Sequence, residues 1–349
     1  MKERELIEQI KRLVGTDSGD LLQGIGDDCA VISKTSDTAW LLTMDTLLEG
    51  VHFDLGLHPP EQLAEKSVAV NVSDIAAMGG KPLFVLLSLG LPRAFDEEWF
   101  VRFSSGLARA LEDYGCLLIG GDTVASPGPV ALTLTVIGEG QVSKILYRSK
   151  ACIGDSIWVS GPLGLSGAGF ELQHMVNRVT PELQPLLDAH LRPSARVDLG
   201  MKLAESGLVH AMMDVSDGLA TDLAHLARAS GVGAKIFADK LFIHPALKRA
   251  AAMLEKDPLQ WMLQGGEDYE LLCTAAPENS DQLVKLAASC GLCLSQVGTV
   301  VSGSGVTLVT GGDGGSEIRE IPVSYQGFDH FRDNERGSNE AAVKAGDCQ

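Results

Sequence analysis

The chain has 349 residues, 45% of them hydrophobic, and a formal net charge of -18. This length suggests about two domains, and the hydrophobic fraction is typical of a globular protein with substantial buried cores. The acidic balance excludes nucleic acid and anionic membranes as partners, because both are bound through Lys and Arg that neutralise phosphate groups. No hydrophobic run reaches the length of a membrane span, and the charged amphipathic start has no signal-peptide core, so we expect a cytoplasmic protein.

The cysteines are odd in number and lie mostly in apolar or helical surroundings: Cys29, Cys116, Cys152, Cys273, Cys290, Cys293 and Cys348. This usage predicts reduced thiols and not a disulfide framework. Cys290 and Cys293 form a lone CxxC, and the sequence has no second pair to complete a zinc site. We expect them to be two buried thiols at a turn.

The first 150 residues predict a mixture of strands and helices. After a short amphipathic helix at the N-terminus, the expected elements are strands at 29–33 and 39–43, a helix at 62–78, a strand at 83–91, a helix at 97–114, and strands at 116–119 and 130–137. Asn71 and Asp74 share one face of the second helix because they are three residues apart. Gly120-Gly121-Asp122 is expected to form a turn.

A domain boundary is expected near residues 148–154. Beyond it we expect a strand at 156–160, helices at 181–190 and 194–206, a strand at 210–214, a helix at 218–229, a strand at 269–275, a helix at 279–290, and strands at 294–300 and 306–309. This mixed order predicts two layered α/β and α+β units, not one doubly wound sheet. The polar, aperiodic segment 332–349 is expected to be disordered.

Six short stretches place acidic residues beside Gly, Ser or Thr at expected strand ends and turns. They are Gly24-Ile25-Gly26-Asp27-Asp28, Thr43-Met44-Asp45-Thr46, Asn71-Val72-Ser73-Asp74, Gly120-Gly121-Asp122-Thr123, Asp214-Val215-Ser216-Asp217-Gly218 and Gly265-Gly266-Glu267-Asp268-Tyr269. Carboxylates gathered in one place repel one another and need a counter-charge. Magnesium prefers carboxylate oxygens and shares its coordination shell with substrate phosphates. The pattern therefore favours phosphoryl chemistry on metal ions.

Any one of these motifs taken alone is more often an Asx-turn or a helix N-cap. Two of them are less ordinary. Asp27 and Asp28 are adjacent carboxylates, which gain nothing as turn formers. The stretch from Asp214 to Asp217 ends a strand and opens a helix, whose free N–H groups suit an anion. The chain contains neither a GxxxxGK[ST] phosphate loop nor a complete dinucleotide fingerprint.

These motifs, in order and with similar spacing, closely resemble the thiamine-monophosphate kinase family. The resemblance also includes His52-Phe53, Arg148-Ser149, Leu191-Arg192-Pro193-Ser194, Glu270-Leu271 and Gly327-Phe328-Asp329-His330-Phe331, and it covers about residues 1–331. It implies the two-domain fold shared with aminoimidazole ribonucleotide synthetase. An N-terminal α/β domain (1–149) pairs strands across a homodimer, and a C-terminal α+β domain (150–331) follows. It also implies the reaction of ATP with thiamine monophosphate to give ADP and thiamine diphosphate.

The resemblance assigns roles to matching positions. The implied Mg2+ ligands are Asp28, Asp45, Asp74, Asp122, Asp214 and Asp217, with Thr43 and Met44, and all but Asp214, Thr43 and Met44 are also taken as catalytic. The implied ATP contacts are Gly121, Asp122, Arg148 and Ser216. The implied thiamine monophosphate contacts are His52, Glu267 and Tyr325. Asp27 is a weaker candidate, and His330 is expected to be structural.

Two positions depart from the family pattern. Met44 stands where the family often has a hydroxyl residue, so only its carbonyl can ligate magnesium. Tyr325 stands where a tryptophan is common, and its ring can still stack on a heterocycle. With these residues we expect direct in-line transfer without a phosphoenzyme, because the transition state needs positioning and neutralisation of charge more than covalent help.

Three other functions stay open on the sequence. One is a sister ATP-dependent synthetase, aminoimidazole ribonucleotide or selenophosphate synthetase, although Cys29 does not fit the reactive residue of the latter. Another is a two-metal nucleotide phosphohydrolase, which would release phosphate without an acceptor. The third is a non-enzymatic cation-binding module, which ATP would not stabilise against unfolding.

Overall fold

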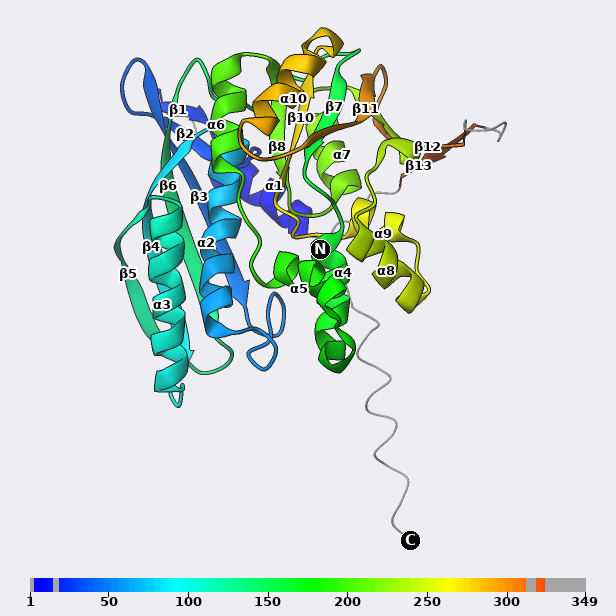
Figure 1. The fold of residues 1–349 in the computed structure, drawn as a ribbon. Coiled ribbons are helices and arrows are strands. Elements are labelled where there is room, and N and C mark those ends of the chain that lie inside the picture. The colour runs from blue at the N-terminus through cyan, green and yellow to red at the C-terminus, as the bar shows by residue number, and fades with distance from the viewer. Residues whose placement is uncertain (1–2, 15–18, 312–317, 324–349) are drawn as a thin grey trace. The chain divides into compact units, whose positions relative to one another are not determined.

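The computed structural model describes residues 3–14, 19–311 and 318–323, and it is drawn in Figure 1. The chain divides into two units, residues 1–18 with 328–349 and residues 19–327. The described part of the first unit is helix α1 (Glu3–Val14), which was expected from the sequence. Tyr325, His330 and the segment 332–349 lie outside the described residues.

The second unit begins with a six-stranded sheet in the order β1-β2-β3-β6-β4-β5. Its strands are β1 (Leu21–Gln23), β2 (Ala30–Ser33), β3 (Thr38–Leu48), β4 (Lys81–Pro92), β5 (Leu117–Ser126) and β6 (Ala131–Gln141). Neighbouring strands are antiparallel except β4 and β5, which run parallel. Helices α2 (Pro60–Ala77) and α3 (Glu97–Asp113) lie side by side over this sheet (Figure 1).

Helix α2 is the central element of this unit. It begins at Pro60, where the missing N–H of proline costs no hydrogen bond, and it ends before Gly79, which has a left-handed φ of 72°. Most of its residues are buried, because it packs on β3, β4 and β6 and also on helix α6 (Val197–Ser206) and strand β8 (Val209–Val215) of the second half of this unit. Polar residues on this helix are therefore held in fixed positions inside the protein.

The second sheet has seven strands in the order β13-β12-β9-β11-β7-β10-β8. They are β7 (Ser156–Ser160), β8 (Val209–Val215), β9 (Gly233–Phe237), β10 (Glu270–Ala275), β11 (Leu294–Val301), β12 (Gly305–Thr310) and β13 (Arg319–Pro322). Only β9 and β12 pair in parallel among these described strands. Two sheets, each with its own helices, confirm the predicted layered α/β and α+β architecture.

The helices of this second half surround the sheet and bury its hydrophobic core. They are α4 (Leu165–Leu172), α5 (Gln184–Leu191), α6 (Val197–Ser206), α7 (Leu219–Ala229), α8 (Pro245–Leu254), α9 (Pro258–Gln264) and α10 (Ser280–Ala288). Short 3-10 turns are η1 (Gln173–Arg178), η2 (Pro181–Leu183), η3 (Ala238–Lys240) and η4 (Pro277–Asn279). None of the helices in the described ranges is long and apolar enough to cross a membrane.

Two expectations about the acidic stretches were wrong. Gly120-Gly121-Asp122 is not a turn, because β5 continues through it in register with β4. The strand expected to stop at Thr43 continues to Leu48, because β6 pairs with it over its whole length. The polar residues Asp45 and Thr46 interrupt the apolar pattern, so the sequence suggested that the strand ends there. The hydrogen bonds to β6 show that it continues.

The expectation about the cysteines was partly right. All six cysteines in the described part of the chain are free thiols. Cys293 is exposed and Cys290 is only half-buried, so the expectation of two buried thiols at that turn was wrong. The turn between α10 and β11 faces solvent, and the apolar residues around it made it look like part of the core.

Candidate active site

Three carboxylates from distant parts of the chain meet in one place. Asp28 lies in the loop between β1 and β2, Asp74 on α2, and Asp214 near the end of β8, and one oxygen from each lies within 4.8 Å of the others. Asp214 is 2% exposed, and the hydroxyl of Ser73 donates to its Oδ2 at 2.5 Å. The convergence of acidic stretches that the sequence hypothesis requires is therefore present for these three residues.

Strand β3 and helix α2 fix one side of this cluster. Thr43 Oγ1 donates a hydrogen bond to Asp74 Oδ2, and the backbone N–H of Asp45 donates to Asn71 Oδ1 at 2.9 Å. Asn71 and Asp74 therefore lie on the same face of α2, as their spacing predicted. Asp45 on β3 is close enough for its charge to raise the pKa of Asp74.

The electrostatics of the cluster favour a bound cation. Burial raises the pKa of Asp28 and of Asp74 well above their usual values, and neighbouring carboxylates raise them further. Burial, with the charges of Asp45 and Asp217, raises the pKa of Asp214 to about 6, although Ser73 and Arg148 oppose the shift. Such groups gain most from a nearby dication, which stabilises their ionised form.

An unsatisfied oxygen supports the same interpretation. Asp28 Oδ2 is buried and has no hydrogen-bond partner among the described residues. A buried acceptor without a partner is costly unless a ligand satisfies it. The donor set consists of carboxylate oxygens, which suits Mg2+. The cluster therefore fits the metal that the sequence predicted.

Arg148 supplies a counter-charge that the sequence hypothesis assigned to metal alone. Its Nη2 forms an ion pair with Asp28 Oδ1, and its Nε lies 3.3 Å from Asp27 Oδ1. The backbone N–H of Arg148 also donates to Asp27 Oδ2 at 3.4 Å. The two adjacent carboxylates thus hold one guanidinium. Burial alone would lower the pKa of Arg148, but Asp28 and Asp27 outweigh it and raise the pKa.

Two loops at the ends of β8 and α9 are joined by backbone hydrogen bonds beside the cluster. Ser216 accepts from the N–H of Glu267 at 2.7 Å, and Val215 accepts from the N–H of Tyr269 at 2.8 Å. A predicted ATP contact and a predicted substrate contact are therefore adjacent. Asp222, which the sequence analysis missed, accepts the N–H of Asp217 at 3.0 Å and is 1% exposed.

Asp122 and Gly121 do not join the cluster within one chain. They lie on β5, which is separated from β3 by β4 and β6, so Asp122 is about 14 Å along the sheet from β3 at the usual strand spacing. Gly121 has a φ of 151°, and a Cβ there would lie 1.8 Å from the carbonyl oxygen of Leu87. Any side chain at this position would displace β4 from β5.

The remaining predicted residues are placed as follows. Met44 is 63% exposed, and its backbone is paired with that of Thr135 on β6. His52 Nδ1 accepts the N–H of Leu48 at 2.9 Å and so fixes the turn after β3. Tyr325 lies outside the described residues. The roles of all these residues as ligands stay predictions.

Comparison with known proteins identifies the family. The model of the AIR synthase related protein N-terminal domain matches residues 26–140, and that of the C-terminal domain matches residues 153–311. The chain is 36% identical to the thiamine-monophosphate kinase of Haemophilus influenzae, over 89% of this chain and 92% of the relative. It is 35% identical to that of Bacillus subtilis, over 95% of this chain and 100% of the relative. The chain belongs to the thiamine-monophosphate kinase family.

A solved member of this family has the same fold. The structure described as AaThiL complexed with AMPPCP and TMP superimposes with a TM-score of 0.82 at 36% identity, covering 95% of this chain and 97% of that chain. The thiamine monophosphate kinase of Aquifex aeolicus gives a TM-score of 0.74 at 34% identity, covering 88% of this chain and 98% of that chain. The family resemblance expected from the motifs is thereby confirmed.

Glu267, a predicted substrate contact, is held by two buried bases. Lys66 Nζ lies 2.8 Å from Glu267 Oε1, and His190 Nδ1 lies 3.2 Å from Oε2. Burial alone would raise the pKa of Glu267, but Lys66 and His190 outweigh it and lower the pKa to about 2. The sequence analysis missed both bases, because Lys66 looks like an ordinary surface lysine of α2.

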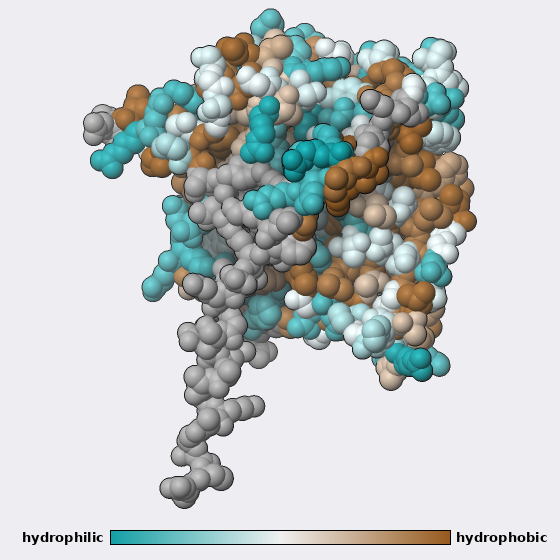
Figure 2. Space-filling model, turned by 180° about the vertical axis from the view of Figure 1, so that it is seen from behind, coloured by the Kyte–Doolittle hydropathy of each residue, from teal (hydrophilic) through white to brown (hydrophobic). Residues whose placement is uncertain are grey.

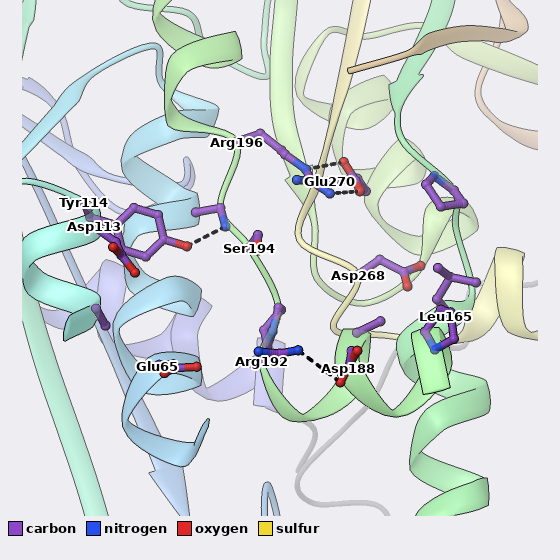
Figure 3. A pocket seen from close by; sticks show the side chains of 16 residues that line it. Glu65, Asp113, Tyr114, Leu165, Asp188, Arg192, Ser194, Arg196, Asp268 and Glu270 are labelled. Carbon is purple, nitrogen blue, oxygen red and sulfur yellow. Dashed lines mark hydrogen bonds and ion pairs between the residues drawn. The ribbon is translucent and has the colours of Figure 1, made fainter. Parts of the chain in front are cut away.

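A cavity of about 700 Å³ opens next to this segment (Figure 3). It is lined by residues of α2, α3, α4 and α5 and by the loop before α6, together with Asp268 and Glu270. Its two arginines are paired within the wall. Arg196 forms two bonds to Glu270, at 2.8 and 2.5 Å, and Arg192 lies 3.4 Å from Asp188. None of the predicted magnesium ligands is among the described residues that line it. The acidic cluster, and not this cavity, is therefore the candidate centre of the chemistry.

Proposed function

We propose that this protein transfers the terminal phosphoryl group of ATP to thiamine monophosphate, giving ADP and thiamine diphosphate. Membership of the thiamine-monophosphate kinase family supports this proposal, as does the similar structure that was solved with AMPPCP and TMP. The observation that carries it is the meeting of Asp28, Asp74 and Asp214 in one partly buried cluster. Two anionic substrates can react there only if their mutual repulsion is offset.

We propose that Asp28, Asp74 and Asp214 hold Mg2+, with Asp45 and Asp217 completing the site. The raised pKa values of the three clustered carboxylates and the unpartnered Asp28 Oδ2 support this assignment. Bound Mg2+ would neutralise and orient phosphate oxygens. Thr43 and Ser73 hold Asp74 and Asp214 in place through hydrogen bonds from their hydroxyl groups.

The remaining residues of the site bind and orient the substrates. Arg148, fixed by Asp27 and Asp28, presents a planar fork of donors that suits ATP phosphate. Ser216 precedes α7, whose N-terminal N–H groups favour an anion. Glu267, held ionised by Lys66, complements the cationic thiazolium or the aminopyrimidine. The acceptor is a phosphate oxygen that is already ionised near neutral pH, so no strong general base is required.

We propose that the protein is a homodimer that pairs through β5. Strand β5 is an edge of its sheet, and no other described strand pairs with its outer side. Leu117, Leu118 and Ile119 expose 63%, 46% and 54% of their surface on this strand. In Figure 2, seen from behind, hydrophobic residues gather on the side of the molecule that carries this sheet. An exposed apolar edge strand is a template for pairing with another chain.

Asp122 would lie at the proposed dimer interface. This residue and Gly121 lie on the same exposed strand, away from the cluster of their own chain.

We further propose domains at residues 1–149 and 150–331 and a cytoplasmic location. The gap between the two matched family models, at 140–153, supports this boundary.

Mass-resolved analysis of the products tests the proposed reaction. The protein is incubated with ATP, Mg2+ and thiamine monophosphate, and the expected products are thiamine diphosphate and ADP in equal amounts. Parallel reactions with thiamine or without an acceptor are the controls. Release of inorganic phosphate without thiamine diphosphate would instead identify a nucleotide phosphohydrolase, and no consumption of ATP with thiamine monophosphate as acceptor would point to a sister synthetase that needs a different substrate.

A further inference from the structure

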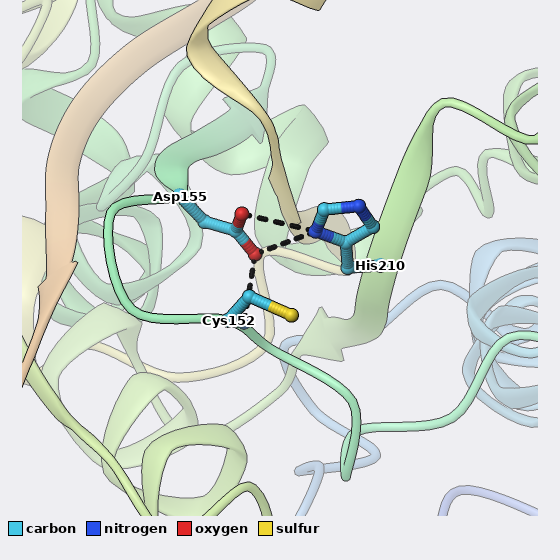
Figure 4. A group of neighbouring side chains, drawn as sticks. All are labelled: Cys152, Asp155 and His210. Carbon is cyan, nitrogen blue, oxygen red and sulfur yellow. Dashed lines mark hydrogen bonds and ion pairs between the residues drawn. The ribbon is translucent and has the colours of Figure 1, made fainter.

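A second group of potential ligands lies outside the proposed active site. Cys152, Asp155 and His210 each offer one donor atom, and these three atoms lie within 4.8 Å of one another (Figure 4). The donors are a sulfur, a carboxylate oxygen and an imidazole nitrogen. This mixture differs from the all-oxygen acidic cluster, and it is a donor set that Zn2+ prefers over Mg2+.

A tight turn holds the first two donors in fixed relative positions. The N–H of Asp155 donates to the carbonyl of Cys152 at 3.0 Å, and the N–H of Cys152 donates to Asp155 Oδ2 at 2.9 Å. Gly154, the third residue of the turn, has a φ of 95°, as a type II turn requires. The turn is anchored to β11, because Val300 and the Gly154–Asp155 segment exchange hydrogen bonds at 2.9 and 2.8 Å.

The third donor approaches from a different strand. His210 lies at the start of β8, and its Nδ1 is 2.9 Å from both carboxylate oxygens of Asp155. Figure 4 shows Nδ1 directed toward the carboxylate, with the sulfur of Cys152 below the ring. Asp155 is 3% exposed, whereas Cys152 is exposed and His210 is partly exposed. The site is therefore a rigid buried carboxylate with two donors that solvent ions can reach.

We propose that Cys152, Asp155 and His210 form a three-ligand site for Zn2+, with water in the fourth position. Bond lengths of about 2.0–2.3 Å place tetrahedral donors roughly 3–4 Å apart, and the three donors, which lie within 4.8 Å of one another, reach this spacing by small side-chain movements. On binding, the thiol of Cys152 loses its proton to solvent and His210 bonds through an unprotonated Nδ1, with its remaining proton on Nε2. The site is independent of the proposed kinase reaction.

A metal here would fasten the segment between the two sheets. Cys152 lies four residues after Arg148, and the turn stands between β6 of the first sheet and β7 of the second. His210 begins the strand that carries Asp214 near its other end. Binding would thus tie this segment to β8, at the end of the strand remote from the acidic cluster. Linkage then predicts that Zn2+ stabilises the folded protein.

Cobalt(II) spectroscopy of the full chain tests the proposal, because Co2+ can replace Zn2+ at such a site. A thiolate bound to Co2+ gives a ligand-to-metal charge-transfer band in the near ultraviolet. The titration is done with excess Mg2+, which occupies the acidic cluster. We expect about one Co2+ per chain to give this band together with the visible bands of tetrahedral cobalt, and Zn2+ to abolish both. Cys152→Ser and His210→Ala should each lose the charge-transfer band or weaken cobalt binding at least tenfold.

Two matched variants identify the thiolate. Cys293→Ser removes the other exposed cysteine among the described residues and should leave the band unchanged. Cys29→Ala removes the buried cysteine next to the acidic cluster and should also leave it unchanged. Absence of the band in the wild-type protein, or its survival in Cys152→Ser, would overturn the proposal. In that case Asp155 and His210 only close the turn by their hydrogen bond.

Discussion

Lys66 Nζ lies 2.8 Å from Glu267 Oε1, and none of the lysine side chain is exposed. The pair joins helix α2, which packs on the first sheet, to the loop that precedes β10 of the second sheet. A buried ammonium group is tolerated only when an opposite charge compensates it. The lysine therefore holds Glu267 ionised and fixes the carboxylate that we propose to recognise thiamine.

Removing the charge of Lys66 should destabilise the protein. Lys66→Met leaves Glu267 without its main counter-charge, so we expect the free energy of unfolding to fall by about 3 kcal/mol. This value is near the lower end for breaking a buried ion pair, because one quarter of the Glu267 side chain is exposed. The measurement is urea unfolding, with Lys285→Met on the exposed face of α10 as the control. The double variant Lys66→Met/Glu267→Gln should regain part of this loss. A single variant as stable as the wild type would show that the pair has no such role.

His58 should make the protein sensitive to acid. Its ring is 1% exposed, its Nε2 lies 2.8 Å from the carbonyl oxygen of Leu191, and burial lowers its pKa from 6.5 to about 3. The unfolded chain therefore binds a proton that the folded chain does not, and stability is lost as the pH falls below the unfolded value. Between pH 6.5 and pH 5 this residue alone should lower the free energy of unfolding by about 2 kcal/mol.

The comparison uses urea unfolding near pH 7 and near pH 5. His58→Gln keeps a donor for Leu191 but does not titrate, so its loss of stability over this range should be smaller than that of the wild type by about 2 kcal/mol. His174→Gln, at an exposed position, is the control and should behave like the wild type. Equal losses in all three proteins would mean that His58 becomes protonated within the folded state.

The edge strand β5 should hold the proposed homodimer together. Leu117 is 63% exposed, and a charge at this position would have to be buried against a like charge on the partner chain. Leu117→Asp should therefore raise the dissociation constant of the dimer at least tenfold, which corresponds to about 1.4 kcal/mol of binding free energy. Val101→Asp on α3, at a residue 65% exposed, is the matched control. Sedimentation velocity measures both. A wild-type monomer, or an unchanged dimer in Leu117→Asp, would rule out pairing through this strand.

Much of the architecture could be predicted because its signals are local. The Pro-Pro and Gly-Gly pairs around α2 mark its ends, and the three-residue spacing of Asn71 and Asp74 places them on one face. The short strand β9 and the helices α8 and α9 were not anticipated. Their sequences carry weak hydrophobic periodicity, and the parallel pairing of β9 with β12 depends on residues about seventy positions away.

The site could be predicted in part for the same reason. Asp28, Asp74 and Asp214 stand in recognisable motifs, whereas the partners that fix the site come from elsewhere in the chain. The pairing of Arg148 with Asp27 and Asp28 spans about 120 residues, as the hydrogen-bond separation shows. The partnership of Lys66 with Glu267 spans still more, and no local pattern distinguishes a buried lysine from a surface one.

The turnover of Asp74→Asn shows whether the acidic cluster carries the metal ions of the reaction. It is measured as thiamine diphosphate formed from ATP and thiamine monophosphate across a range of Mg2+ concentrations. We expect a loss of at least a hundredfold, about 2.7 kcal/mol in transition-state stabilisation, with the urea unfolding curve little changed. Near-normal turnover in Asp74→Asn with an unaltered dependence on Mg2+ would contradict the claim that this acidic cluster carries the metal ions of the reaction.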